Sequence, residues 1–296
     1  MKEFIIRILI LIAIIAAVDL SIGSVFAYME QHAKGGYIGH HNYITNKTNE
    51  DVLVFGSSRA IHHYNPQIIQ DSLNLSCYNC GQDGNGIILF YGWWQLIKER
   101  YTPSVIIYDL APGFDLFIGD DNHRYLGWLK GSYEQKCINE IFDYIDATEK
   151  YKMLSRLYRY NSQFMQIIVD YFHPLYAISE NGFLPLYGEL DSMRVHDPHE
   201  PAVHMVDSIK LHFLNAFIEQ TKDIRLVFVV SPDYTGGDTT QHAFFKELCS
   251  KNGIPFLDYS NNPKYVHNAD YFVDGAHLNA LGADEFTRDI TQQLKQ

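Results

Sequence analysis

Short apolar runs bounded by small or polar residues constrain the fold of this chain more than any other feature. The clearest are Val52–Phe55, Val105–Tyr108 and Leu226–Val230. Apolar runs of four or five residues are typical of strands that are buried on both faces, as in a parallel sheet. Two weaker runs, Ser76–Asn79 and Pro255–Asp258, extend the series. The sequence therefore predicts five short strands.

Segments with helical length and period separate these runs. They begin at Asn65-Pro66, where proline suits a first turn, and continue at 87–99, 202–220, 242–251 and 280–294. Strands that alternate with helices form parallel sheets with right-handed crossovers. We therefore predict a doubly wound α/β domain.

The predicted domain covers residues 51–296, and residues 116–205 interrupt its alternation. This segment is rich in Tyr, Asp and Lys at helical spacing and holds no run that resembles a strand. We interpret it as a mostly helical insertion. Because it follows a strand whose end faces the predicted site, we expect it to cover that site as a lid.

The N-terminus carries a long apolar stretch. Residues 4–29 are long enough to span a bilayer as a helix. Lys2 and Arg7 favour a cytoplasmic N-terminus and an exported body. Residues 1–29 are thus a transmembrane anchor or a signal sequence. The polar residues 30–50 are interpreted as a juxtamembrane connector.

A cleaved signal peptide that ends at Ala27 is the alternative to an anchor. We favour the uncleaved anchor, because the region between the apolar run and this cleavage site would be unusually long and would contain Asp19. A carboxylate inside a spanning helix is costly unless it lies near the interface or meets a partner.

Composition excludes one class of partner. The formal net charge of −12 argues against nucleic-acid binding, which requires a basic face.

Four cysteines in 296 residues do not make a disulfide scaffold. Cys77 and Cys80, if they lie on a strand, point to opposite faces and are better explained by core packing than by redox chemistry.

Two polar segments fall where the chemistry of a parallel sheet is expected, beyond the carboxyl ends of its strands. Gly56-Ser57-Ser58 follows the first strand and would present a serine hydroxyl at the start of a helix. Asp274-Gly275-Ala276-His277 precedes the last helix. A nucleophilic serine needs a base, and the base needs an acceptor that fixes its tautomer. Ser58, His277 and Asp274 are therefore the predicted catalytic triad.

These blocks resemble those of the SGNH/GDSL hydrolase superfamily, over about residues 51–296. Gly56-Ser57-Ser58 matches the Gly-Asp-Ser block with Ser in place of Asp, and Asp274-Gly275-Ala276-His277 matches the final Asp-x-x-His block. Asn79-Cys80-Gly81-Gln82-Asp83-Gly84 is similar to the second block. The resemblance implies a three-layer α/β/α fold, and an oxyanion hole formed by the amides of Ser58 and Gly84. The wider pattern is similar to a divergent, membrane-anchored bacterial branch.

The third block of the superfamily departs from this pattern. Its Asn, which serves the oxyanion hole, has no counterpart at the end of the third strand, where the chain reads Asp109 to Asp115. A carboxylate cannot donate to an oxyanion unless it is protonated. Asn85 and Arg59 are the nearest replacement donors in sequence. Asp109 or Asp115 would instead orient Arg59 or the substrate.

Other sites are less well supported. Gly81-x-x-Gly84-x-Gly86 lacks the spacing of a dinucleotide fingerprint and the lysine of a P-loop. His196 and His199 have the spacing of metal ligands, but Pro198 breaks the helix that would align them. We therefore expect neither a cofactor nor a metal.

The predicted function is that of an extracytoplasmic serine esterase or O-acyltransferase. The resemblance implies an acylated small molecule or cell-envelope glycan as substrate, with the membrane as the other partner. A non-catalytic binding or assembly subunit of a glycan-modification system remains the alternative, supported by the missing Asn.

Overall fold

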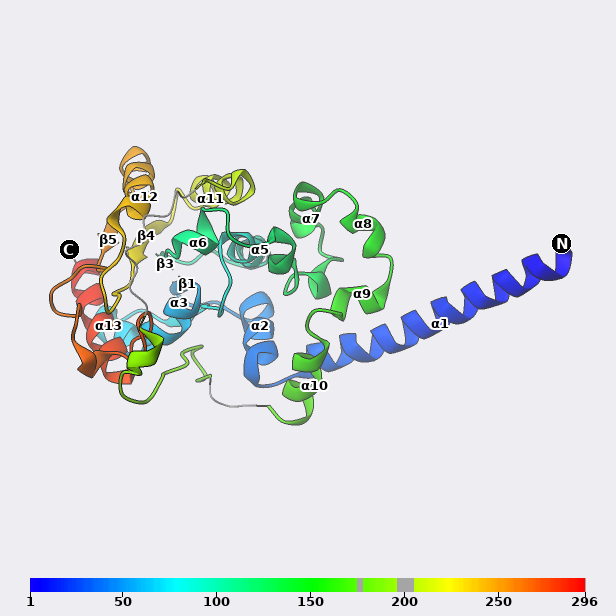
Figure 1. Ribbon diagram of the computed structural model, residues 1–296, viewed down its shortest axis with the longest axis horizontal. Coiled ribbons are helices and arrows are strands. Elements are labelled where there is room, and N and C mark those ends of the chain that lie inside the picture. Colours follow the sequence, from blue (N-terminus) through cyan, green and yellow to red (C-terminus); the bar gives the residue numbers. More distant parts are fainter. Residues whose placement is uncertain (175–177, 196–204, 296) are drawn as a thin grey trace.

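The computed structural model describes residues 1–174, 178–195 and 205–295, and its centre is a five-stranded sheet (Figure 1). The strand order is β2-β1-β3-β4-β5, and every neighbouring pair is parallel. The strands are β1 (Val52–Gly56), β2 (Cys77–Asn79), β3 (Val105–Asp109), β4 (Arg225–Val230) and β5 (Phe256–Asp258). The prediction of a mixed α/β fold with a parallel sheet is confirmed, and each predicted run forms a strand.

Helices cover both faces of this sheet. Leu53 and Phe55 of β1 belong to one apolar cluster, whereas Val52 and Val54 belong to another, because alternate strand residues point to opposite faces. The first cluster includes side chains of α5 (Ile87–Lys98), α11 (Ser208–Gln220) and α12 (Thr239–Asn252). The second includes those of α4 (Pro66–Leu73) and α13 (Ala280–Leu294). Burial of each such aliphatic side chain contributes about 1.5–3 kcal/mol.

The cysteines follow the same alternation. Cys77 packs in the second cluster and Cys80 in the first, and both are buried free thiols. Their placement in the core agrees with the interpretation of this pair as packing residues.

The described residues of the insertion form short helices that turns connect. After α6 (Pro112–Asp115), which precedes the insertion, its elements are η1 (Asn122–Leu126), η2 (Lys130–Ser132), η3 (Lys136–Ile138), α7 (Asn139–Ile145), α8 (Glu149–Lys152), α9 (Arg156–Tyr160), α10 (Phe164–Phe172) and η4 (Ser192–Arg194). Among the described residues of this segment, the only strand-like pairing is a single bridge between Phe117 and Val206. Helices are thus present in the described part of the insertion, although residues 178–191 form none.

The predicted start of one helix is wrong. Helix α11 begins at Ser208 rather than at 202, because Asp207 caps it by accepting hydrogen bonds from the amides of Ile209 and Lys210. The predicted start of that helix and the polar segment around His196 fall in 196–204, outside the described residues.

Residues 36–46 form helix α2 (Gly36–Asn46) rather than an exposed connector. Ile38 and Ile44 are fully buried, and His40 bonds through its two ring nitrogens to the Tyr78 hydroxyl and the Gly81 carbonyl, each at 3.0 Å. Burial lowers the pKa of His40 to about 4, so that the ring is neutral at pH 7. His40, His41 and Thr45 of this helix are buried and hydrogen-bonded, so these polar residues face partners in the fold and not solvent.

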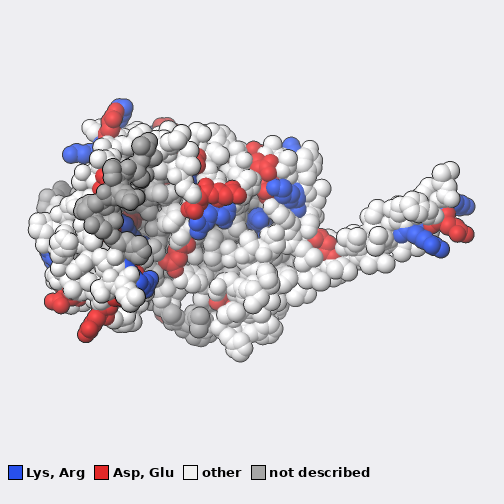
Figure 2. All heavy atoms as spheres, viewed as in Figure 1, with Lys and Arg blue, Asp and Glu red and all other residues white. Residues whose placement is uncertain are grey.

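Helix α1 (Lys2–His32) projects from the body (Figure 1). It is long and apolar enough to cross a membrane, and none of its most apolar window is buried. Figure 2 shows the projecting part as an almost uncharged rod with charged side chains gathered at its free end. A signal sequence has the same features.

Candidate active site

The turn after β1 places Ser58 at the first residue of the short helix α3 (Ser58–His63). Gly56 makes this turn possible because its φ of +141° is strained for any other residue. A side chain there would also meet the carbonyl oxygen of Asp109 at 2.6 Å and the Cβ of Ala60 at 2.9 Å. The chain can therefore turn sharply against β3 and present the Ser58 hydroxyl beyond the end of the sheet.

A tight turn before α13 holds the other two predicted triad residues. The Val273 amide donates to the His277 carbonyl at 2.9 Å. One carboxylate oxygen of Asp274 accepts hydrogen bonds from the amides of Ala276 and His277, each at 2.9 Å. This turn brings the Asp274 and His277 side chains to the same side of the loop.

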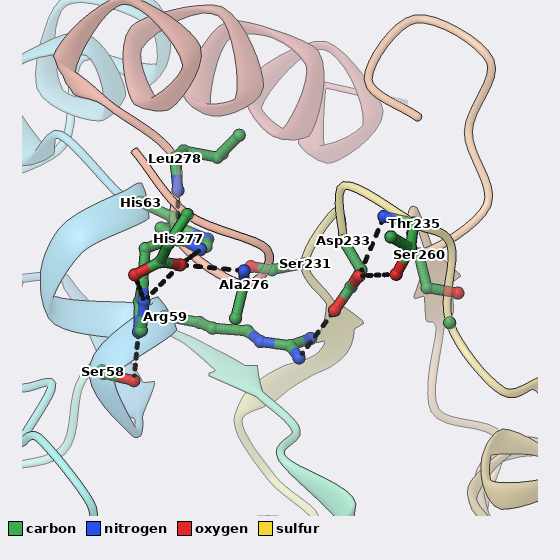
Figure 3. A network of polar contacts seen from close by, with 12 residues as sticks. Ser58, Arg59, His63, Ser231, Asp233, Thr235, Ser260, Ala276, His277 and Leu278 are labelled. Carbon is green, nitrogen blue, oxygen red and sulfur yellow. Dashed lines mark hydrogen bonds and ion pairs between the residues drawn. The ribbon is translucent and has the colours of Figure 1, made fainter. Parts of the chain in front are cut away.

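The structure brings Ser58, His277 and Asp274 into one hydrogen-bonded chain. His277 Nε2 lies 2.9 Å from Ser58 Oγ, and its Nδ1 lies 3.0 and 3.1 Å from the two carboxylate oxygens of Asp274. Because a carboxylate can only accept, Nδ1 carries the proton and the Nε2 lone pair faces the serine hydroxyl. Figure 3 shows Ser58 on its helix directly below the His277 ring.

Asp274 is held as an anion. Burial alone would raise its pKa, but hydrogen bonds from the His277 ring and from the two turn amides outweigh burial and lower the pKa to about 2. Arg194 Nη2 lies 3.0 Å from the outer oxygen of this carboxylate. The Arg194 side chain is 64% exposed, so solvent screens much of this attraction.

A pocket of about 360 Å³ opens over the triad. It is lined by Ser58, His62, Asp83, Leu186, Tyr187, Arg194, Val273, Asp274 and His277. Polar and apolar groups both contribute to this lining, which suits a small acyl group joined to a polar carrier.

Within the described part of the insertion, the residues that reach this pocket lie near its end. The Asp191 amide donates to the Val273 carbonyl at 2.9 Å, and the Ala280 amide donates to the Leu186 carbonyl at 2.7 Å. The earlier helices α9 and α10 instead contact α1. Of the described residues of the expected lid, those at the pocket lie in the stretch around 184–194, whereas α9 and α10 pack against α1.

His62 ties three segments together at the wall of the pocket. Its Nδ1 lies 2.6 Å from the Leu184 carbonyl oxygen, and its Nε2 lies 3.0 Å from the Asp83 carboxylate. Tyr37 donates to the other Asp83 oxygen at 2.5 Å. The His62 ring stands edge-on to His277, with the ring centroids 5.7 Å apart. These contacts fix three segments around His277, namely the insertion, α3 and the loop after β2.

The resemblance assigns the oxyanion hole to the backbone amides of Ser58 and Gly84. Within the described part of the chain, no hydrogen bond occupies the amide of Ser58 or that of Gly84. Gly84 adopts a φ of +63°, and its carbonyl accepts from Arg124 at 3.1 Å. The side-chain amide of Asn85, in contrast, donates to the backbone carbonyl of Asp83 at 2.8 Å. Asn85 is therefore engaged within its own turn and is a poor replacement donor.

Arg59 points away from the triad. Its guanidinium lies 3.4 Å from Asp233, in the loop after β4 (Figure 3). Asp109 instead accepts hydrogen bonds from Tyr64 and Ser231, and Asp115 accepts from Tyr108 and from the Ala111 amide. These four partners, and not Arg59, hold the two carboxylates in place.

Among the described residues, no hydrogen bond or ion pair joins Arg59 to Asp109 or Asp115, so the expected orientation of Arg59 by either carboxylate finds no direct contact, and orientation of a substrate stays a prediction. Both carboxylates are buried, and burial raises the pKa of Asp109 to about 6 and that of Asp115 to about 7. They anchor the end of β3 to its neighbours. Sequence position at a strand end does not reveal whether a side chain points into the core or into the cleft.

Three residues near the site had weak or no sequence signals. His63 Nε2 accepts from the Leu278 amide at 3.0 Å and so holds the His277 loop against α3. In the sequence, the adjacent pair His62-His63 is a weak signal without a motif around it. Arg194 gave no signal, because it lies in a polar stretch without pattern.

One possible metal-binding group occurs among the described residues, and it lies in the insertion. Ligand atoms of His123, Asp146 and Glu149 lie within 4.8 Å of one another. The Lys152 ammonium already contacts both carboxylates, at 3.0 and 2.6 Å. That ammonium occupies the position in which a cation would neutralise the acidic pair.

No protein-family model matches this sequence, and no curated protein matches it either. The chemistry of the site is therefore argued from its own geometry and from the motifs that resemble the SGNH/GDSL blocks.

Proposed function

We propose that this protein is a serine esterase or O-acyltransferase with a three-layer SGNH-type fold. The observation that carries the proposal is the relay from Asp274 through His277 to Ser58, with heavy-atom distances of 3.0 and 2.9 Å. These distances are within hydrogen-bond reach without any movement. The relay lies in a pocket beyond the ends of parallel strands, where ligands bind in this class of fold.

The geometry supports a two-step acyl transfer. Ser58 Oγ attacks the ester carbonyl while its proton passes to His277 Nε2, and Asp274 stabilises the resulting imidazolium. The amides of Ser58 and Gly84 would donate to the oxyanion. Collapse expels the alcohol, which takes the proton from His277, and leaves an acyl group on Ser58. In the second step His277 deprotonates water, which makes an esterase, or a sugar hydroxyl, which makes a transferase.

We place the enzyme outside the cytoplasm, anchored by α1. The helix has the length of a membrane span, and Lys2 and Arg7 near its free end favour a cytoplasmic N-terminus. An exported domain would meet acylated envelope glycans or small esters there. The mixed polar lining of the pocket fits such substrates.

Covalent labelling with a fluorophosphonate tests the nucleophile. We expect the purified protein to be labelled on Ser58, and Ser58→Ala and His277→Ala each to abolish labelling. Ser57→Ala is the matched control, since this buried neighbouring serine lies outside the relay. The double variant Ser58→Ala/His277→Ala should turn over phenyl acetate scarcely worse than either single variant, because coupled catalytic residues are non-additive.

Two results would contradict catalysis. One is a folded protein that takes no label at Ser58, and the other is an unchanged rate of phenyl acetate hydrolysis in Ser58→Ala. Either would favour the non-catalytic binding or assembly subunit.

A further inference from the structure

Asp19 lies within the apolar part of α1, yet its carboxylate is engaged by the segment that opens α9. One oxygen accepts from the Ser155 hydroxyl at 2.5 Å and from the Leu157 amide at 3.1 Å, and the other accepts from the Arg156 amide at 2.8 Å. These bonds satisfy amides at the start of α9 that have no partner within the helix. The one charge in the middle of α1 is thus used to join the helix to the body.

The joint continues along α1 toward the body. A side chain at Gly23 would meet the Cβ of Arg156 at 2.4 Å, so the two segments are in direct backbone contact there. Arg156 also donates to the Ser24 hydroxyl at 2.6 Å. Further along, Met29 packs in an apolar cluster with Tyr160. From Asp19 onward α1 is therefore a packed part of the body rather than a flexible tether.

The length of α1 sets the depth of this joint in a membrane. A hydrocarbon core of about 30 Å needs about 20 helical residues at about 1.5 Å each. The apolar stretch begins at Phe4, so its outer boundary falls at about residue 23. Residues 155–157, which contact Asp19, therefore lie at or just inside the outer boundary of the hydrocarbon core.

The side chains at this level suit a membrane interface. Leu154 is 78% exposed and Tyr151 is 65% exposed, although both are large and apolar or amphipathic. Lys150 flanks them in sequence. Tyrosine and lysine beside an exposed leucine are typical of segments that lie in the headgroup region. Figure 1 places α8 and α9 at the end of the body from which the free half of α1 projects.

We propose that the corner between α8 and α9, residues 150–157, is a second membrane contact that seats in the outer lipid interface beside α1. The proposal rests on the anchor in the proposed function, and it adds that the body is held in one orientation. Helix α3 and the turn that precedes α13, which together carry the site, lie toward the opposite end of the body (Figure 1). The site is thereby presented to envelope polymers or soluble esters rather than to lipid headgroups.

Lipid-depth quenching tests this contact on the full chain. Leu154→Cys, in a Cys137→Ser background, is labelled with an environment-sensitive fluorophore and reconstituted in phosphatidylcholine vesicles that carry doxyl lipids. The other three cysteines are buried and should stay unlabelled. The matched control is Leu281→Cys on α13, a leucine that is 56% exposed at the other end of the body.

We expect the label at Leu154 to be quenched at least twofold more than the label at Leu281, with an emission maximum at shorter wavelength. Asp19→Ala should bring the quenching at Leu154 close to the control value while α1 stays inserted. Asp19→Asn should retain part of it, because the amide oxygen still accepts one bond. Quenching at Leu154 no greater than at Leu281 would overturn the proposal. So would a mature chain that begins at Tyr28, since it lacks Asp19. Fluorophosphonate labelling of Ser58 in the same vesicles reports separately on the proposed chemistry.

Discussion

Replacement of Asp274 by Asn separates the electrostatic role of this residue from its role in the turn. An Asn oxygen can still accept from the amides of Ala276 and His277, as the inner Asp274 oxygen does. The other position becomes an NH2 group, which faces Arg194 and the His277 ring as a donor. The turn should therefore persist, whereas the imidazole loses the acceptor that holds its proton on Nδ1.

The expected loss of activity is large. In another serine hydrolase the same change lowers kcat by about 10⁴-fold because the imidazole takes the wrong tautomer. At about 1.36 kcal/mol per tenfold change, this corresponds to about 5 kcal/mol of barrier. We expect a loss of similar size in Asp274→Asn for phenyl acetate hydrolysis.

The expected loss of stability is smaller. The pKa of Asp274 is about 2 in the fold, below the ordinary value of 3.8 for this side chain. Because the folded-state value is the lower one, ionisation stabilises the fold above pH 4, and this contribution is lost as pH falls through about 2. The difference corresponds to about 2 kcal/mol at neutral pH. For a domain of this size, Tm should fall by about 4–8 °C.

Initial rates of ester hydrolysis and thermal unfolding at pH 7 measure the two effects. Asp270→Asn, at an exposed aspartate four residues earlier, is the matched control and should change neither quantity. Asp274→Asn with a rate within tenfold of the wild type would refute the assigned role of Asp274 in the relay. A rate reduced only in proportion to unfolded protein would show that Asp274 serves the turn alone.

Two further predictions concern the structure that supports the site. Gly81→Ala should destabilise the fold by about 1–3 kcal/mol or more, because the added Cβ would meet the Ile61 amide nitrogen at 2.2 Å. Gly113→Ala, which meets nothing within 4 Å, should leave Tm nearly unchanged. Burial raises the pKa of Asp109 to about 6, so its ionisation should lower the free energy of unfolding as pH rises from about 4 to about 6. In Asp109→Asn, the decrease in the free energy of unfolding over this pH range should be smaller than in the wild type by up to about 3 kcal/mol, as measured by urea titration. A pH dependence equal to that of the wild type would contradict this reasoning.

The sheet could be predicted from sequence because its signal is local. Val105–Tyr108 and Leu226–Val230 are continuous apolar runs, and they can only be buried by helices on both faces of a sheet. The turn residues Gly56 and Pro66 mark where strands end and helices begin. Parallel register then follows from alternation with helices, and it brings the ends of β1 and β3 to the same edge.

Helix α2 and the pocket wall could not be predicted, because their polar side chains are satisfied by distant partners. His40 forms hydrogen bonds with Tyr78 and Gly81, which lie about forty residues away in sequence. These hydrogen bonds offset the free-energy cost of burying its polar ring. Arg194 reaches Asp274 across eighty residues of chain. Polar residues such as these give no sign in the sequence that the fold supplies their hydrogen-bond partners.

The end of β3 shows how the missing oxyanion donor bears on the chemistry. The resemblance places the Asn block directly after the third strand, and Asp109 is the residue at the end of that strand. Its carboxylate is fully buried and accepts hydrogen bonds from Tyr64 and Ser231. It cannot turn toward the cleft without leaving two hydroxyls unpaired in the core, at about 1–3 kcal/mol each. The oxyanion would then depend on the two backbone amides. Loss of a third donor costs about 2.7–4 kcal/mol in other enzymes. We therefore infer that turnover is slow unless the acyl carrier supplies a hydroxyl donor of its own, which favours a polyhydroxylated carrier over a simple ester.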